Sequence, residues 1–452
     1  MVRGAGFGRP GKMTSVKLST VLSALSYALD LTEGQPLGHA ARSCLIGMRI
    51  AEELGLPAGD RSDLFYALLM KDAGCSSNAA RVYQLFGGDD QPAKRGLWTR
   101  DWRLWRNKLA YAVEFTAPDG TPLERMKQFA TLAVTGPSSQ RELFAIRCDR
   151  GADIARELGV SEPTAIAIRT MDEHWDGGGY PEGLRREQIP LAARIIGLAQ
   201  VAEIYWGLGG PGAAIDMARE RRGRWFDPEL VRVLHAIGPS DRVWSELQTE
   251  TLSDAIATAE PVERVIPADE SRLDRIAHAF ALVVDAKSSF TYRHSDRVAA
   301  AAEGIGAQMG LPQDQRVRIR RAGLLHDIGK LAVPNRILDK PDKLDADEWA
   351  IVKQHPYFSY EILARVPVFS DFAYDASCHH ERVDGLGYYR GVGGDALSLH
   401  ARILATADIY DALSAARPYR EAMPLERVLS IIREGRGTQL CPDTVDALCA
   451  RV

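Results

Sequence analysis

Apolar residues recur three and four positions apart along most of the chain. Clear examples are the segments LSTVLSALSYALDL (18–31), SCLIGMRIAEELGL (43–56), RVAAAAEGIGAQMGL (297–311) and AARILATADIYDAL (400–413). This spacing places the apolar side chains on one face of an α-helix, whereas the alternation typical of strands is scarce. Glycine and proline stand where these helices are expected to end. The pattern therefore predicts an all-α protein.

The pattern also repeats, because two distant segments share the motif Asp-Gly-x-Gly-Tyr. The first reads EHWDGGGYPEGL from residue 173, and the second reads ERVDGLGYYRGV from residue 381. Other positions keep the same register, since 33 residues separate His39 from Asp72 and also His294 from Asp327. A constant register over both halves is typical of a duplicated domain. We therefore expect two tandem helical domains.

One interval differs between the two copies. From Asp72 to Arg147 the first half has 75 residues, whereas the second half has 28 from Asp327 to His355. The first half therefore carries 47 additional residues, which we place at about 76–135.

The predicted domain boundaries follow from the repeat. We expect a first domain at 14–240, a linker at 241–270, where the periodicity weakens, and a second domain at 271–452. Within the insertion, the segment KRGLWTRDWRLWRNKL spaces its tryptophans as on one face of a helix. It predicts a single amphipathic helix that carries Trp98, Trp102 and Trp105, with binding of single-stranded nucleic acid as the alternative interpretation.

The overall charge and the apolar segments exclude some classes of partner. The 452 residues carry a formal net charge of -4, so no global positive field attracts nucleic acid, and duplex DNA is not expected as a partner. No apolar run approaches the roughly 20 residues that span a bilayer, so no membrane is expected either. The six cysteines form no CxxC pair, which suits reduced thiols. We expect a cytoplasmic protein.

The second half collects metal-binding side chains at positions set by the repeat. Directing five imidazoles and two carboxylates inward is costly unless a bound cation compensates their desolvation. Mixed histidine and carboxylate ligands suit Fe, Mn, Zn or Ni. The residues predicted to form this metal site are His294, His326, Asp327, His355, His379, His380 and Asp408.

Seven ligands exceed what one ion takes, so the set predicts two divalent ions clamped around a phosphate ester. Asp327, between His326 and the next turn, is the expected bridging ligand. Lys330 lies three residues further on, on the same face as Asp327, and is expected to pair with a phosphate oxygen. A solvated surface lysine is the alternative interpretation of Lys330.

Three segments together resemble the HD-GYP family, bacterial metal-dependent phosphodiesterases of cyclic dinucleotides within the HD phosphohydrolase superfamily. They are LLHDIGKLAVPNRILDKPDKLDADEWAIVKQHP, HHERVDGLGYYRG and ADIYDALSAARPYREAM, within about residues 275–435. The resemblance implies the seven ligands given above and catalytic roles for Asp327 and Lys330. It also implies a substrate site that includes Lys330, Gly385, Tyr388, Arg417 and Arg420.

The resemblance further implies hydrolysis of a cyclic dinucleotide to the linear dinucleotide or the mononucleotide. Cyclic di-GMP is the first expected substrate and 3′,3′ cyclic GMP-AMP the second. Fe or Mn is expected in the site, with Ni or Zn as alternatives. Phe290 stands where three-metal members supply a glutamate, which favours two ions. Tyr389 replaces the family proline, which leaves the substrate preference open.

Other functions and partners stay open at this point. A non-hydrolysing cyclic dinucleotide receptor and a phosphohydrolase of another nucleotide are the alternative functions. A homodimer is expected, and a diguanylate cyclase-type protein is a candidate partner.

The first half keeps the motif loop but not the ligands. Lysine and arginine stand where two histidines stand in the second half, and they would repel a cation. We therefore expect a degenerate HD-GYP-like domain with a regulatory or dimerising role, in which a nucleotide could bind with Lys71 and Arg147 replacing metal charge. The corresponding residues are His39, Lys71, Asp72, Arg147, Met171, Asp172 and Gln200.

Overall fold

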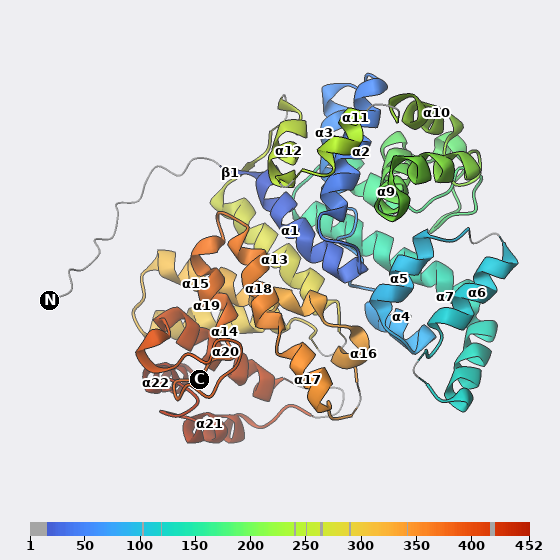
Figure 1. Ribbon diagram of the computed structural model, residues 1–452. Helices are drawn as coiled ribbons and strands as arrows, with labels where there is room; N and C mark the ends of the chain where they lie inside the picture. Colours follow the sequence, from blue (N-terminus) through green and yellow to red (C-terminus); the bar gives the residue numbers. More distant parts are fainter. Residues whose placement is uncertain are drawn as a thin grey trace.

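The computed structural model describes residues 16–452 except 102–103, 119, 239–240, 250, 263–264, 289–290, 341 and 416–420. Phe290, Arg417 and Arg420 therefore lie outside the described residues. Among the described residues, the only regular strands are β1 (Val16–Lys17) and β2 (Pro267–Ala268), which pair antiparallel. Helices make up the rest of the regular structure (Figure 1). The predicted all-α class is confirmed.

Twelve α-helices are described before β2, and they lie mostly in the blue to green part of Figure 1. In chain order they are α1 (Leu18–Glu33), α2 (His39–Glu53), α3 (Ala58–Met70), α4 (Ala79–Phe86), α5 (Asp90–Trp98), α6 (Trp105–Phe115), α7 (Pro122–Glu157), α8 (Glu162–Thr170), α9 (Leu191–Glu220), α10 (Pro228–Ile237), α11 (Asp241–Glu246) and α12 (Leu252–Ala259). A short 3₁₀ turn, η1 (Arg186–Gln188), precedes α9.

The second half follows β2, in yellow to red. Its helices are α13 (Glu270–Asp285), α14 (His294–Gln308), α15 (Gln313–Leu325), α16 (Asn335–Leu338), α17 (Ala346–Val352), α18 (His355–Ala364), α19 (Ser370–Ser377), α20 (Leu399–Ser414), α21 (Leu425–Glu434) and α22 (Pro442–Arg451). The 3₁₀ segments η3 (Ile328–Ala332) and η4 (Gly394–Ala396) lie between them.

The two halves repeat the same helices. Helices α2 and α14 each have 15 residues and each begin at a motif histidine, His39 and His294. Helices α3 and α15 each have 13 residues, and they end just before Lys71 and His326. Helices α9 and α20 both begin shortly after a 3₁₀ turn that follows the Asp-Gly-x-Gly-Tyr loop. The sequence register therefore corresponds to a register of helices.

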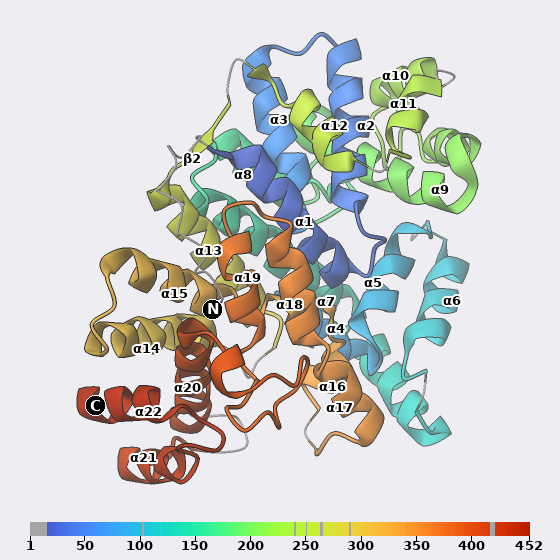
Figure 2. The same ribbon diagram turned by 60° about the vertical axis from the view of Figure 1, so that its left-hand side comes forward.

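The additional residues of the first half contain α4, α5, α6 and the start of α7, which project as a lobe beside the second half (Figures 1 and 2). Trp98 is the last residue of α5 and is buried, whereas Trp105 is the first residue of α6 and is 67% exposed. The prediction of one amphipathic helix across both tryptophans is therefore wrong. Trp98 turns inward, where the guanidinium of Arg147 lies 5.4 Å from its ring centre. Trp102 lies outside the described residues.

The segment 241–270, expected as a linker, contains α11, α12 and β2. Helix α12 packs on α1 and α2, and α11 packs on α2. The side chain of Glu260, buried at the end of α12, accepts a hydrogen bond from the Tyr66 hydroxyl at 2.8 Å. These contacts attach the segment to the first half.

Helix α1 also joins the two halves, because it packs on η3 and on α18. Helix α13 packs on α7 and η3, and one continuous cluster of buried apolar side chains extends through both halves.

Helix α9 is the one described helix that is long and apolar enough to cross a membrane, with a mean hydropathy of 1.2 over 18 residues. Of that window, 56% is buried inside the protein, which is typical of a core helix. Non-helical backbone at Gly209 and Gly210, followed by Pro211, interrupts α9.

Candidate metal centre

Seven side chains of the second half meet where α14, α15, α18, α19 and α20 converge. His294 and His355 are the first residues of their helices, so both imidazoles lie at helix starts. His326 and Asp327 directly follow α15. His379 and His380 follow α19, and Asp408 lies within α20. All are buried except the half-buried His380. The site contains His294, His326, Asp327, His355, His379, His380 and Asp408.

Asp327 lies between two groups of imidazoles. Its Oδ1 is 3.3 Å from Nε2 of His355 and 3.6 Å from Nε2 of His379. Its Oδ2 is 3.5 Å from Nε2 of His294 and 3.3 Å from Nε2 of His326. One carboxylate therefore faces both groups, one with each oxygen.

Asp408 closes the other side of the site. Its Oδ1 lies 3.3 Å from Nε2 of His294 and 3.9 Å from Nε2 of His326. Its Oδ2 lies 3.9 Å from Nδ1 of His380. The two carboxylates thus stand among all five imidazoles.

Backbone carbonyls orient three of the histidines. Nδ1 of His326 donates to the carbonyl of Gly323 at 2.7 Å, and Nδ1 of His355 donates to that of Val352 at 2.7 Å. Nδ1 of His379 donates to the carbonyl of Ala376 at 2.6 Å. Because Nδ1 carries the proton in each ring, the Nε2 lone pair faces the centre, as in metal-binding histidines.

The charges of these groups suit a cation. Burial lowers the pKa of His355 to about 4 and that of His380 well below its usual range, which favours neutral imidazoles. Burial alone would raise the pKa of Asp327, but His326 and Lys330 hold it well below its usual range. His355 and His380 therefore offer neutral nitrogen and Asp327 offers ionised oxygen, whereas Asp327, Asp408 and Asp411 raise the pKa of His294 well above its usual range although burial opposes that shift.

Two of the inward-facing atoms have no hydrogen-bond partner among the described residues. They are Nε2 of His326 and Oδ1 of Asp327, and both are buried. A buried polar atom without a partner is unfavourable, and a bound cation removes that cost. Ligand atoms within 4.8 Å of one another form two groups that share Asp327. The donor set fits divalent metal on these grounds.

Lys330 lies at the edge of the centre on η3. Its ammonium donates to Oδ2 of Asp327 at 2.5 Å, and its side chain is 22% exposed. Lys330 thus lies on the same face as Asp327, as expected, and its contact with Asp327 is an addition to what the sequence predicted. A contact between Lys330 and phosphate stays a prediction.

The second Asp-Gly-x-Gly-Tyr loop passes beside the centre. The ring of Tyr388 stacks on His380, with centroids 4.7 Å apart, and meets Trp349 at 5.9 Å. Gly385 has φ +75°, a left-handed conformation that favours glycine. Tyr388 thus extends the site away from the ligands with an aromatic surface.

Tyr389 takes a backbone conformation closed to proline. Its φ is +90°, whereas a proline ring fixes φ near −65°. The Arg390 guanidinium lies over the ring of Tyr389 at 4.7 Å. The first loop keeps Pro181 after a cis peptide bond, so the two loops differ in shape at this position.

Sequence reasoning missed two buried carboxylates, Glu381 and Asp411. Glu381 accepts from the backbone N–H groups of Arg390 at 2.6 Å and Gly391 at 3.2 Å, which anchors the loop. Asp411 accepts from Nδ1 of His294 at 2.7 Å. The repeat could have identified both residues, because Glu173 and Glu203 occupy the matching positions in the first half.

In the first half, protein cations stand where the second half has ligands. The ammonium of Lys71 lies 2.9 Å from Nε2 of His39 and pairs with Asp72. Arg147 donates to Oδ1 of Asp172 at 3.0 Å. Glu33, Asp72 and Cys75 also come together there. With Lys71 and Arg147 beside them, these acidic groups already have counter-charges.

Known proteins share this architecture. The family model of the HD domain matches residues 134–230 and 279–443. The "3'3'-cGAMP-specific phosphodiesterase 3" of Vibrio cholerae is 43% identical over 431 residues, which are 95% of this chain and 94% of that protein. A cyclic di-GMP phosphodiesterase response regulator of Xanthomonas campestris is 40% identical over 182 residues, which are 40% of this chain and 47% of that protein.

A solved structure is similar over both halves. The crystal structure of a cyclic GMP-AMP specific phosphodiesterase of V. cholerae matches with a TM-score of 0.66 and 38% identity. The match covers 96% of this chain and 97% of that one. The family resemblance expected from the motifs is confirmed. The chain therefore belongs to the HD domain family and, within it, to the HD-GYP type of cyclic dinucleotide phosphodiesterases.

Proposed function

We propose that the second-half centre hydrolyses 3′,3′ cyclic GMP-AMP, with cyclic di-GMP as the second candidate substrate. The single observation that carries hydrolysis is the buried set of seven ligands arranged around Asp327. The choice of substrate is supported by the V. cholerae relative that is similar over nearly the whole chain and is named for cyclic GMP-AMP. The cyclic di-GMP relative reported above covers less than half of this chain.

The ligand atoms suggest how two divalent ions would be held. His294 and His326 face Oδ2 of Asp327, and His355 and His379 face Oδ1. Asp408 faces His294 with Oδ1 and His380 with Oδ2. Asp327 would then bridge the pair. When bound, such ions supply Lewis acidity and lower the pKa of water for in-line attack on phosphorus. Iron or manganese is our proposed occupant.

The protein's own groups would position the substrate. Lys330, already beside Asp327, would exchange that contact for a phosphate oxygen and balance the charge that develops there. Tyr388 and Trp349 offer aromatic faces for a base, and the ammonium of Lys353 lies 5.8 Å from the Tyr388 ring centre. Gly385, Arg417 and Arg420 remain predicted substrate contacts.

A receptor without activity is the second candidate function. A receptor needs groups that bind phosphate, but it has no use for five imidazoles that converge on two carboxylates. The complete donor set therefore favours an enzyme.

The test is hydrolysis of each cyclic dinucleotide by protein purified without oxygen and supplied with Mn²⁺ or Fe²⁺. Products are separated by chromatography, and bound metal is measured in the same samples. Asp327→Ala removes the shared ligand, and Asp347→Asn, at an exposed position in α17, is the matched control. We expect turnover in the wild type and in Asp347→Asn only.

Faster turnover of cyclic GMP-AMP than of cyclic di-GMP supports the proposed substrate. The reverse order would replace it with cyclic di-GMP. Binding of either dinucleotide without turnover, with metal present, would identify a receptor instead.

A further inference from the structure

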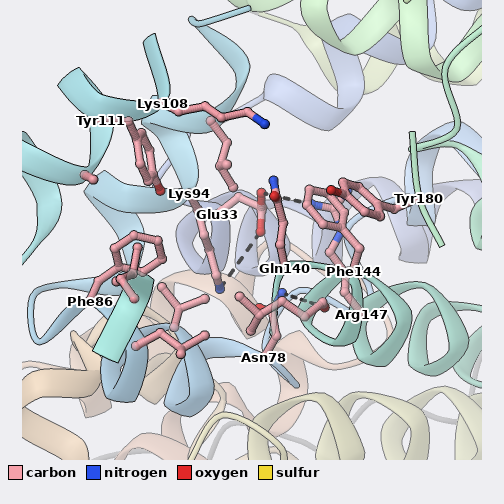
Figure 3. A pocket seen from close by; sticks show the side chains of 16 residues that line it. Glu33, Asn78, Phe86, Lys94, Lys108, Tyr111, Gln140, Phe144, Arg147 and Tyr180 are labelled. Carbon is pink, nitrogen blue, oxygen red and sulfur yellow. Dashed lines mark hydrogen bonds and ion pairs between the residues drawn. The ribbon is translucent and has the colours of Figure 1, made fainter. Parts of the chain in front are cut away.

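The first half contains a cavity of about 320 Å³ that no step of the proposed reaction uses. It lies between the lobe of α4–α6 and the middle of α7 (Figure 3). Its walls are mostly apolar and aromatic and include Phe86, Tyr111, Phe144 and Tyr180. A volume and lining of this kind are typical of sites for small ligands.

Charged groups are buried in this apolar wall. Glu33, 2% exposed, lies between the ammonium of Lys94 at 4.0 Å and the guanidinium of Arg147 at 3.9 Å (Figure 3). Three buried atoms of lining residues have no hydrogen-bond partner among the described residues: Glu33 Oε1, Asn78 Oδ1 and Arg147 Nε. Unsatisfied polar atoms at a cavity indicate a missing partner.

The cavity lies beside the residues that correspond to the metal centre of the second half, and of those seven residues Arg147 lines it. Arg147 matches His355, and Tyr180 matches Tyr388. A second cavity of about 160 Å³ shares Phe144 and Tyr180 and reaches Asp172, which matches His380. The duplication has therefore kept a hollow in the first half next to the position that corresponds to the predicted substrate site.

Its flat wall and its charges point to one ligand class. The rings of Phe144 and Tyr180 stack 4.9 Å apart at 14°, which leaves a planar aromatic surface. The carboxylate of Glu33 can accept from two adjacent N–H donors. Lys108 is exposed, and its ammonium points over the cavity in Figure 3, where it can meet an anion.

We propose that this cavity binds a guanine nucleotide, with the base against the aromatic wall, its N1–H and amino group on Glu33, and the phosphate toward Lys108. Lys71 is not among the lining residues, because its ammonium is held by His39 and Asp72. Of the two cations first expected to replace metal charge, only Arg147 reaches the cavity.

Helix α5 connects this cavity to the catalytic half. Lys94 lines the cavity, and one turn earlier Asp90 accepts from the backbone N–H of Asn335 at 3.2 Å. Gln91 donates to the carbonyl of Leu331 at 3.4 Å. Leu331 follows Lys330 directly on η3, so a ligand that shifts α5 acts on the segment that carries Lys330. Occupancy of the cavity is therefore expected to change turnover.

The first experiment is calorimetric titration of the full-length, chelator-treated protein with GMP. Chelation removes metal from the catalytic half, so binding there is weakened while the charges of the cavity remain. Glu33→Gln keeps the shape of the side chain and removes the acceptor charge. Ala112→Trp fills the cavity from α6, and Glu53→Gln, exposed on α2, is the control.

We expect one site whose affinity falls at least tenfold in Glu33→Gln and in Ala112→Trp but not in Glu53→Gln. IMP, which lacks the amino group, should bind more weakly than GMP, and AMP more weakly still. No GMP binding by the wild type, or equal binding by the wild type and both cavity variants, would overturn the proposal. Because no turnover is measured, this result is independent of the proposed function.

The second experiment measures turnover of the metal-loaded enzyme with and without GMP. We expect GMP to change kcat at least twofold in the wild type and in Glu53→Gln, and not in Glu33→Gln or Ala112→Trp. A kcat that is unaffected while the cavity is saturated would overturn the coupling through α5. A GMP effect of equal size in Glu33→Gln would place the action of GMP at the catalytic site.

Discussion

Asp411 accepts a hydrogen bond from Nδ1 of His294 at 2.7 Å, and Arg297 in turn holds Asp411. The first half repeats this relationship, since Glu203 contacts Nδ1 of His39 and also pairs with Arg42. A carboxylate in this position fixes the ring and keeps Nε2 free for the centre. Asp411 is thus a positioning residue, one step removed from the reacting atoms.

Replacing Asp411 by Asn should lower metal affinity and turnover by about 10- to 100-fold, the usual effect of losing such a partner. Asp411→Glu should retain much of both, because the first half uses Glu203 at this place. Metal affinity is measured by competition with a chelator, with Asp395→Asn at an exposed position as the control. Unchanged metal affinity in Asp411→Asn would contradict the role.

The pH dependence of stability should include a contribution from Asp30. Burial raises the pKa of Asp30 to about 6 from its usual value of 3.8, although it accepts from Gly38 N at 2.7 Å and Ala40 N at 3.0 Å. Because the folded state holds this proton more tightly, the contribution is greatest below about pH 4 and is lost as pH rises through 6. The full loss corresponds to about 3 kcal/mol.

Asp30→Asn should remove this pH-dependent contribution while keeping an oxygen acceptor at the start of α2. The measurement is the difference in unfolding free energy between the wild type and the variant, from urea titrations at several pH values. The difference cancels other titrating groups that the two proteins share. A difference that stays constant between about pH 4 and pH 7 would show that Asp30 titrates normally.

Gly329→Ala should displace His355. A Cβ on Gly329 would lie 2.0 Å from the carbonyl oxygen of His355, which leaves no room for a methyl group. We expect a loss of stability of about 1–3 kcal/mol, typical of overpacking, and a larger loss of turnover. Gly435→Ala is the control, because its Cβ would meet nothing closer than 3.5 Å. Equal turnover in the two variants would mean that η3 and α18 can separate freely.

Lys71→Met should destabilise the first half. The ammonium of Lys71 is buried against Asp72 and His39, so its removal leaves Asp72 without this close counter-charge. Losing one partner of such a pair costs about 3–5 kcal/mol. Thermal unfolding measures this loss, and the metal content of the second half should stay unchanged. A variant as stable as the wild type would show that Asp72 takes up a proton or another partner instead.

The sequence could predict what depends on spacing. The helical class, the repeat and the cluster around Asp327 follow from periodicity and from intervals that persist between two copies. The roles of Glu381 and Asp411 were not predicted, although the repeat places Glu173 and Glu203 at the matching positions, because a single carboxylate usually faces solvent. Only tertiary packing shows that both are buried acceptors.

The structure of the lobe of α4–α6 was also not predicted correctly from the sequence. Its tryptophan spacing fits one helix, but α5 ends at Trp98, which is buried against Arg147, and α6 begins at the exposed Trp105. The cavity beneath the lobe arises from contacts among α4, α5, α6 and α7, which no local pattern encodes.

Lys71 supplies the first half with a positive charge that is part of the chain, so the charge balance of that half does not depend on the metal concentration. The second half would take its balancing cations from solution and lose them as supply falls, which would leave the ammonium of Lys330 beside Asp327. The first half cannot lose Lys71 and keeps its shape. Starvation for metal would therefore stop the proposed hydrolysis, while the first half, with its cavity beside Glu33, would remain folded and able to bind the proposed nucleotide.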